Sequence, residues 1–289
     1  PLSADYDFIT KDDKESISKA ISILSKLTSG SINISLRKES DSFLRELNDV
    51  IIHNVSGPHP SGNLSTIINR VSPINKGDVI WTLNLPDLVL IGKAFLELKF
   101  SAERIIALVG SSVSDPKYVK TLIGSDVSGL LNLKEKNSRI ISGNVLTGTK
   151  LDSNAHLRYY NNEITAIPEG NDYDLFGWAK PMFDKFSVSR ALTFSWLFPE
   201  KKYDLNTNTN GEHRAFVVTG SFEEVFPLDI YPMQILKACM YKDLDEMEAL
   251  GMYEVSPEDF ALTEFICVSK QPHQNIIREG LDLMKKEIG

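Results

Sequence analysis

The first hundred residues alternate between helix-type and strand-type hydrophobic patterns. Residues 11–29 carry apolar side chains at helical spacing between Thr10 and Gly30, which predicts a capped amphipathic helix. Residues 32–36 alternate apolar with small polar side chains and predict a short strand. The further predicted elements are a helix at 41–47, a buried strand at 50–52, a helix at 63–70, a strand at 79–85, a helix at 87–98 and a strand at 104–109. This order predicts an α/β domain over residues 1–115, with a parallel sheet covered by helices on both faces.

The pattern changes after residue 115. A strand is predicted to begin at Tyr118, a short helix capped by Asp126 follows, and residues 139–142 form another strand. This is the element order of a small β-grasp module, which we place at residues 116–163.

A mixed connecting region with loops rich in Asn, Gly and Pro follows at residues 164–220. Six aromatic residues gather within about twenty positions of it; they are Trp178, Phe183, Phe186, Phe194, Trp196 and Phe198. Core packing is the commoner cause of such a cluster and is the favoured interpretation, and a quinone or partner surface is the alternative.

The last segment, residues 221–289, is predicted to be a helical C-terminal domain. Short breaks divide it into four helices, at 232–241, 243–250, 256–268 and 272–288. The third helix begins with a cap, a proline and an acidic first turn, provided by Ser256, Pro257, Glu258 and Asp259.

Composition indicates a folded chain and excludes two classes of partner. The 289 residues are 42% hydrophobic and carry a formal net charge of −8 with scattered lysines, which argues against a nucleic-acid partner. The most apolar block, residues 83–100, is interrupted by charges, so we expect no direct membrane insertion. Cys239 and Cys267 give no disulfide framework, which fits a reducing compartment.

Motifs that bind cofactors or metals are missing from the sequence. There is no GxGxxG, GxSxG or HExxH, and the five histidines form no metal-ligand spacing. The nearest phosphate-loop match, residues 143–150, has Thr and Lys in the wrong order and is interpreted as a turn. We therefore expect no catalytic residues and no metal site in this chain.

One turn is a weak candidate for a binding site. Gly57, His59, Ser61 and Gly62 lie after a predicted strand and before a predicted helix, where free N–H groups can hold an anion. His59 can titrate near neutral pH. The favoured interpretation is a rigid turn, with prolines fixing φ and Ser61 or Asn63 capping the helix.

Several longer segments follow one another in a distinctive order. They are HPSG at 59–62, VIWTLNLPDLVLIGKAFL at 79–96, ERIIALVG at 103–110, FGWAKPMFDKFSVSR at 176–190, NGEHRAFVVTGSFEEVFPLDIYP at 210–232 and EDFALTEFICVSK at 258–270. In this order the chain resembles, over nearly its whole length, the A subunit of the Na⁺-translocating NADH:quinone oxidoreductases. That family is related to the C subunit of Rnf complexes and to the flavoprotein subunit of complex I.

The resemblance implies a multidomain fold. It implies a Rossmann-like parallel sheet, then a soluble-ligand-binding β-grasp module, then a helical ferredoxin-like domain without clusters. Only Cys267 stands where the related Rnf protein has a cysteine run, and one thiolate cannot hold an iron–sulfur cluster. The chain begins at Pro1 without Met, so we also expect it to be a fragment that lacks the N-terminal part of the family.

The resemblance also implies a function. The family is a peripheral subunit on the cytoplasmic face of the bacterial inner membrane, in a complex that couples NADH oxidation and quinone reduction to Na⁺ export. We expect this chain to be structural or to provide quinone access, with no cofactor of its own. NADH, flavins, iron–sulfur centres and quinone then belong to other subunits, including membrane subunits, and quinone also stays open as a partner of this chain. The alternative is a flavin- or nicotinamide-binding oxidoreductase module of the complex I flavoprotein type.

Overall fold

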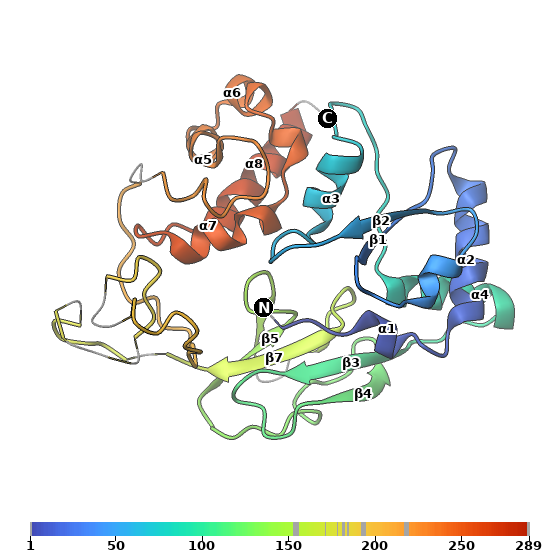
Figure 1. The fold of residues 1–289 in the computed structure, drawn as a ribbon, viewed down its shortest axis with the longest axis horizontal. Coiled ribbons are helices and arrows are strands. Elements are labelled where there is room, and N and C mark those ends of the chain that lie inside the picture. Colours follow the sequence, from blue (N-terminus) through green and yellow to red (C-terminus); the bar gives the residue numbers. More distant parts are fainter. Residues whose placement is uncertain are drawn as a thin grey trace.

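The computed structural model describes residues 2–152, 156–170, 172–177, 179–180, 183, 185–191, 195–216 and 220–287. These residues form an N-terminal α/β unit, a five-stranded sheet and a C-terminal group of helices (Figure 1). Parallel and antiparallel strand pairs both occur, so the chain has a mixed α/β architecture.

The N-terminal unit packs two helices against a small parallel sheet. Its elements are α1 (Tyr6–Ile9), α2 (Lys14–Leu27), β1 (Asn33–Arg37), the 3₁₀ turn η1 (Phe43–Glu46), β2 (Ile51–Val55), α3 (Leu64–Val71) and α4 (Leu85–Glu97). β1 and β2 pair in parallel, with Ile34 opposite Ile52. Ile17, Ile21 and Val89 form the buried core between α2, α4 and the strands. The predicted amphipathic helix at 11–29 is confirmed as α2.

The predicted strand at 79–85 is wrong. Residues 79–84 are not assigned to a strand, and α4 already begins at Leu85 with Pro86 in its first turn. A strand needs a hydrogen-bonded neighbour, and β1 and β2 pair only with each other among the described strands. The apolar side chains of Val79 and Trp81 are therefore exposed.

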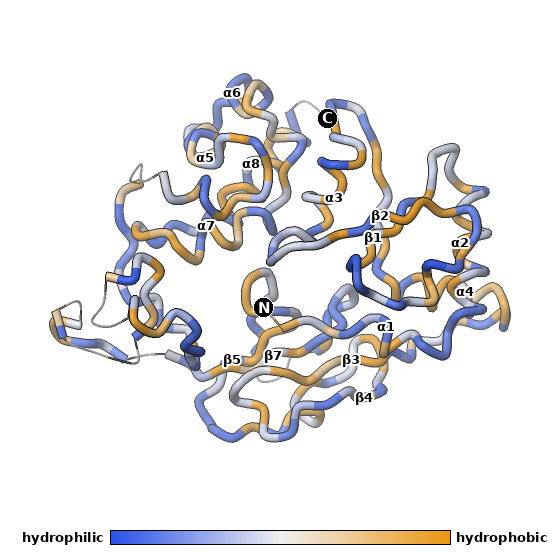
Figure 2. The backbone as a smooth tube through the Cα atoms, viewed as in Figure 1, coloured by the Kyte–Doolittle hydropathy of each residue, from blue (hydrophilic) through white to orange (hydrophobic). Residues whose placement is uncertain are grey.

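The five-stranded sheet has a mixed topology. Its strands are β3 (Glu103–Val109), β4 (Lys117–Leu122), β5 (Ser138–Ser142), β6 (Thr149–Leu151) and β7 (Glu163–Pro168), in the order β4-β3-β7-β5-β6. β3 and β7 are parallel, and the other pairs are antiparallel. Hydrophobic residues run along β3 and β7 (Figure 2), and Ile106, Leu108 and Ile164 are fully buried on one face.

Two further predictions are corrected by this sheet. The strand at 104–109 is not part of the parallel sheet of the N-terminal unit, because β3 pairs with β4, its neighbour along the chain, in an antiparallel hairpin. The short helix predicted after Asp126 is a turn, since the Asp126 carboxylate accepts hydrogen bonds from the backbone and hydroxyl of Ser128, both at 2.8 Å.

The C-terminal segment is helical, as predicted. It contains α5 (Pro232–Tyr241), α6 (Leu244–Ala249), the 3₁₀ turns η2 (Met252–Glu254) and η3 (Pro257–Phe260), α7 (Ala261–Ile266) and α8 (His273–Glu287). The predicted third helix is divided into η3 and α7, and Ser256 begins it with a capping box to Asp259. Leu236, Met252 and Ile277 lie at the centre of an apolar core.

The crossing of α2 and α4 depends on Gly92. A Cβ at this position would lie 1.8 Å from the carbonyl oxygen of Ser16, so the two helix backbones are in direct contact. Helix propensity alone would make Gly92→Ala stabilising by about 1 kcal/mol. We expect the opposite, a loss of about 1–3 kcal/mol in the free energy of unfolding, because the helices must separate. Urea unfolding monitored by circular dichroism measures this change.

The matched control is Gly129→Ala, where an added Cβ meets nothing within 4 Å. Its free energy of unfolding should stay close to that of the parent chain. A Gly92→Ala variant as stable as the control would show that α2 and α4 do not pack this closely.

Candidate functional site

The candidate turn lies between β2 and α3, as the sequence predicts. Its backbone is held internally, because the N–H of Ser61 donates to the carbonyl of Pro58 at 2.9 Å and the N–H of Asn63 donates to that of Pro60 at 2.8 Å. Gly57 has a φ of 123°, which favours glycine. His59 is exposed, and partial desolvation lowers its pKa, which favours the neutral imidazole at neutral pH.

The N-terminus of α3 lies next to an acidic residue of the C-terminal segment, Glu258. Asn63 is the N-cap residue, and its side chain makes no capping hydrogen bond. The backbone N–H groups of Leu64 and Ser65 face the carboxyl group of Glu258 in η3 and oppose the rise of its pKa. The dipole of a helix favours an acidic group at its N-terminus. The start of α3 is therefore next to an acidic residue of the C-terminal segment.

Two more acidic residues contact the same side of α3. The hydroxyl of Ser65 donates to Asp259, and the side-chain amide of Asn69, one helical turn later, donates to Glu254. Farther along, Lys76 forms an ion pair with Glu248 at 3.3 Å. We call this set of contacts between α3 and the C-terminal helices the α3 joint.

A cavity of about 480 Å³ lies at the α3 joint. Its lining combines α3, the turns η2 and η3, the start of α8 and Thr147 from the loop between β5 and β6. Gln274 in α8 donates to the carbonyl of Leu146 in that loop at 2.9 Å. Three parts of the chain that are distant in sequence thus meet here, and the view in Figure 1 shows α3 next to the C-terminal helices.

Burial controls the charge of the acidic groups at the joint. Desolvation raises the pKa of Glu258, the negative charge of Asp259 adds to this effect, and the backbone N–H groups at the start of α3 oppose it. Desolvation also raises the pKa of Asp259, against hydrogen bonds from Ser65 and Ser256. The joint therefore holds two neighbouring carboxyl groups that both resist ionisation.

A second polar cluster joins the N-terminal unit to the five-stranded sheet. Arg104 in β3 forms a buried ion pair with Asp87 in the first turn of α4, at 2.6 Å. Desolvation raises the pKa of Tyr6 in α1. The negative charges of Glu163 and Asp87 raise it further, and the positive charge of Arg104 lowers it. Desolvation raises the pKa of Glu163 to about 7, and the backbone N–H of Ala4 opposes this rise. Nearby, residues of α1, α4, β3 and β4 line a cavity of about 430 Å³.

The two cysteines and the buried histidine belong to the C-terminal core. Cys239 and Cys267 are free and buried, and desolvation raises the pKa of Cys239 to about 11, so it is a thiol at neutral pH. Nδ1 of His273 is 2.9 Å from the hydroxyl of Thr263, and desolvation lowers its pKa to about 4. No group of three or more potential metal ligands occurs among the residues that the structure describes.

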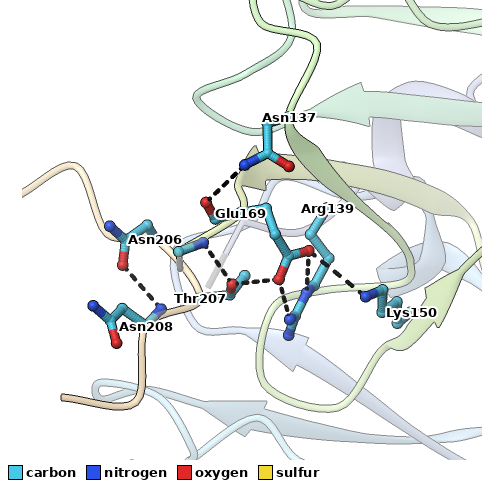
Figure 3. Close-up of polar contacts among 8 residues, drawn as sticks. Asn137, Arg139, Lys150, Glu169, Asn206, Thr207 and Asn208 are labelled. Atoms are coloured by element: carbon cyan, nitrogen blue, oxygen red, sulfur yellow. Dashed lines mark hydrogen bonds and ion pairs between the residues drawn. The ribbon is translucent and has the colours of Figure 1, made fainter. Parts of the chain in front are cut away.

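The polar segment at residues 204–211 is attached to the end of β7 through Thr207, whose N–H donates to the carbonyl of Pro168 at 3.3 Å. Glu169 accepts hydrogen bonds from Arg139 and from the hydroxyl of Thr207, the latter at 2.8 Å, and lies 3.7 Å from Lys150 (Figure 3). The hydrogen bond from Arg139 is the main reason that the pKa of Glu169 is lowered to about 2. Thr207 in turn accepts from the N–H of Gly170 at 2.9 Å.

The four residues of the aromatic cluster that the structure describes are not packed in a core, contrary to the favoured sequence interpretation. Trp178 and Phe194 lie outside the described residues. Trp196 is 61% exposed, and Phe183, Phe186 and Phe198 are exposed as well. Phe186 contacts Tyr203 and Phe265 through its ring, at centroid distances of 5.5 and 5.6 Å. The four described residues thus place large apolar side chains at the surface.

The turn was predictable from the sequence, but its partner was not. Glu258 and Asp259 were assigned to the first turn of their own helix, and that role is confirmed for Asp259 by the capping box. The hydrogen bond between Ser65 and Asp259 joins residues that are 194 positions apart in the sequence, and no local spacing predicts it. The only signal was an N-terminus of α3 for which the sequence offered no acidic residue in the first turn.

No helix in the part of the chain that the structure describes combines the length and the apolar character needed to cross a membrane.

Comparison of the sequence with known proteins shows similarity to one family. A family model described as the NqrA second alpha/beta domain matches residues 1–100, and one described as the NQRA C-terminal domain matches residues 105–153. The A subunit of the Na(+)-translocating NADH-quinone reductase of Neisseria meningitidis serogroup B is 35% identical over 291 residues, which is 99% of this chain. The same protein of Vibrio atlanticus is 35% identical over 295 residues, again 99% of this chain. The chain spans 65% of the length of each of these relatives.

The raised pKa of Glu163 predicts a pH-dependent stability. Its value of about 7 lies above the ordinary 4.5, so its contribution is complete below about pH 4.5 and is lost as the pH rises through about 7. A shift of this size corresponds to about 3 kcal/mol. We expect Glu163→Gln to raise the melting temperature at pH 8 and to change it little at pH 4.5, as measured by calorimetry.

Exposed Glu135 provides the control, because Glu135→Gln removes the same charge without affecting a buried group. Its melting temperature should follow that of the parent chain at both pH values. Equal effects of the two substitutions at pH 8 would mean that Glu163 ionises as a solvent-exposed carboxylate does.

Proposed function

Because the chain belongs to the NqrA family, the A subunits of the Na(+)-translocating NADH-quinone reductases, we propose that it serves as the corresponding subunit of such a complex. The complex would couple NADH oxidation and quinone reduction to the export of Na⁺. The observation that carries this proposal is the 35% identity that extends over 99% of the chain. Within the complex, the chain has a structural or quinone-access role and does not transfer electrons itself.

We propose a division of the chain into three domains. Residues 1–100 form a Rossmann-like domain, the sheet from β3 to β7 forms a β-grasp module, and residues 221–289 form a ferredoxin-like helical domain without clusters. The pairing of β3 with β4 and β7 supports a first boundary near residue 101, and not at residue 115. The apolar contacts of Phe226, Leu228 and Cys267 in one core support folding of the helical domain without iron.

In this role the redox cofactors belong to other subunits. Burial of Cys239 and Cys267 in the apolar core supports this, because thiolates that bind a cluster must face it. The turn containing Gly57, His59, Ser61 and Gly62 then has a structural role, since it leads into α3, where Ser65 donates to Asp259 of the C-terminal segment.

In the same role the chain is held at the cytoplasmic face of the membrane through protein contacts. Residues 172–205 contain five acidic and five basic residues, so they carry no net attraction for anionic lipid. Exposed Trp, Tyr and Leu side chains stand among them, as in the centres of protein interfaces. We propose that this surface binds another protein of the complex.

The isolated chain is expected to be colourless and inactive. Purified without denaturant, it should show neither flavin nor iron–sulfur absorbance, and it should not oxidise NADH faster than a heat-denatured sample. A stoichiometric flavin spectrum, or NADH oxidation above that control, would show that this chain itself has a redox role and would overturn the proposal.

The proposed docking surface, residues 172–205, predicts that Trp196→Ala weakens assembly with the other subunits. Trp196 is 61% exposed, and loss of a tryptophan at the centre of an interface weakens binding by about 2 kcal/mol or more, about thirtyfold. The variant in the full-length protein should co-purify poorly with the other subunits from membranes. The matched control is Trp81→Ala, 88% exposed and in the N-terminal unit, which should co-purify normally. Normal assembly of the Trp196 variant would place the docking surface elsewhere.

A further inference from the structure

Asn210 and Gly211 form the only Asn-Gly pair in the sequence. Both residues are exposed, and neither belongs to a helix or a strand. They lie between Thr207, which donates to Glu169 at the sheet, and Arg214, whose N–H donates to a carbonyl of the C-terminal helical segment. Water therefore reaches the pair, and no helix or sheet hydrogen bonds fix its backbone.

The main-chain nitrogen of Gly211 is unprotected. Within the part of the chain that the structure describes, its N–H donates no hydrogen bond. Glycine also has no Cβ to shield the nitrogen or to restrict the rotations that bring it toward the preceding side chain. This nitrogen can therefore approach the side-chain carbon Cγ of Asn210.

The side chain of Asn210 is held by a weak contact. Its Nδ2 donates to the carbonyl oxygen of Asn208 at 3.2 Å, and its backbone N–H donates to Oδ1 of Asn208 at 3.3 Å. Both distances are at the long end of the range for N–H···O hydrogen bonds. Since these bonds are also exposed, water replaces them at little cost. The side chain of Asn210 can thus turn toward Gly211.

The nearby Asn208 is held more firmly. Its Nδ2 donates to the carbonyl oxygen of Asp172 at 2.6 Å, and its N–H donates to Oδ1 of Asn206 at 2.9 Å (Figure 3). The next residue is Thr209, whose β-branched side chain restricts the backbone beside its nitrogen. Asn208 therefore provides a comparison of the same residue type, two positions away, without the features of Asn210.

We propose that Asn210 is a site of spontaneous deamidation. The nitrogen of Gly211 loses its proton to hydroxide and attacks Cγ of Asn210. A new N–Cγ bond forms, the Cγ–Nδ2 bond breaks, and Nδ2 leaves as ammonia after taking a proton from water. Water then opens the resulting succinimide ring at either carbonyl, which gives aspartate when the new bond breaks and isoaspartate when the original peptide bond breaks. The overall reaction consumes water and releases ammonia, with no change in oxidation state.

Either product adds a negative charge beside a cation of the C-terminal segment. A Cβ on Gly211 would lie 3.3 Å from Cε of Lys270, so the lysine stem lies against the residue that follows Asn210. An exposed pair of opposite charges contributes little to stability, so the helical core should stay folded after the reaction. Isoaspartate also adds a carbon atom to the main chain, which changes its path between Thr207 and Arg214.

The experiment is incubation of the whole chain at neutral and at mildly alkaline pH, followed by digestion and tandem mass spectrometry. Residue 210 should gain about 1 Da, because an amide NH₂ is replaced by OH. Ammonia should be released in equal amount, and part of the product should be isoaspartate. Conversion should be faster at the higher pH, since the deprotonated nitrogen is the nucleophile. Asn208 and Asn137, which precedes the first residue of β5, should convert more slowly.

Gly211→Ala tests the role of the glycine nitrogen and leaves Asn210 in place. The φ of Gly211 is outside the left-handed region, and the added Cβ would meet only the flexible side chain of Lys270. The variant should therefore fold as the parent chain does. Conversion at residue 210 should slow at least about threefold, because alanine restricts and shields the nitrogen. Gly129→Ala, whose Cβ meets nothing within 4 Å, is the matched control and should convert at the parent rate.

Two results would overturn the proposal. The first is conversion at residue 210 that is no faster than at Asn208 and Asn137. The second is a Gly211→Ala variant that converts as fast as the parent chain. If this variant unfolds, the comparison of Asn210 with Asn208 in the parent chain still decides the question. Because the measurement reads a mass and not an activity, its failure would leave the proposed role in a complex untouched.

Discussion

The ion pair between Asp87 and Arg104 is the contact on which the arrangement of the N-terminal half depends. It joins the first turn of α4 to the first residues of β3, and both side chains are almost fully buried. Arg104 also donates to the carbonyl of Tyr159 and lies 5.5 Å from the ring of that residue. Loss of one partner of a buried pair leaves an uncompensated charge and costs about 3–5 kcal/mol. Within the α/β unit and the sheet, the position of α4 on β3 is therefore strongly determined.

Other contacts between distant parts of the chain are also made through carboxyl groups. The C-terminal helices meet α3 through carboxyl groups that accept uncharged donors, and the polar segment after β7 meets the sheet through Glu169. The hydrogen bond from Arg139 lowers the pKa of Glu169 to about 2, while burial raises the pKa of Asp259 against the hydrogen bonds from Ser65 and Ser256. The balance between burial and the hydrogen-bond partner therefore sets the direction of the pKa shift at each contact.

The sequence predicted those parts of the structure that depend on local pattern. α2, the parallel pair β1 and β2, the hairpin strands β4 and β5 and the C-terminal helices follow from periodicity and capping residues. The prediction of a strand at 79–85 failed because these apolar residues have no neighbouring strand with which to pair. β3 was assigned to the wrong sheet, because a strand pattern does not specify its partner. The joint at α3 could not be predicted, since Ser65 and Asp259 are brought together only by the packing of distant segments.

The attachment of Thr207 to Glu169 also limits how far the C-terminal helices could move. Arg214 and Ala215 are already bound to Ser269 and Gln271 of the helical domain. The sheet and the helices are thus connected by six residues, 208–213. A connection of this length spans about 25 Å when fully extended. On so short a connection, η3 is present around α3 at an effective concentration in the millimolar range. The contact between Ser65 and Asp259 therefore forms within one chain, and its equilibrium is independent of how dilute the protein is.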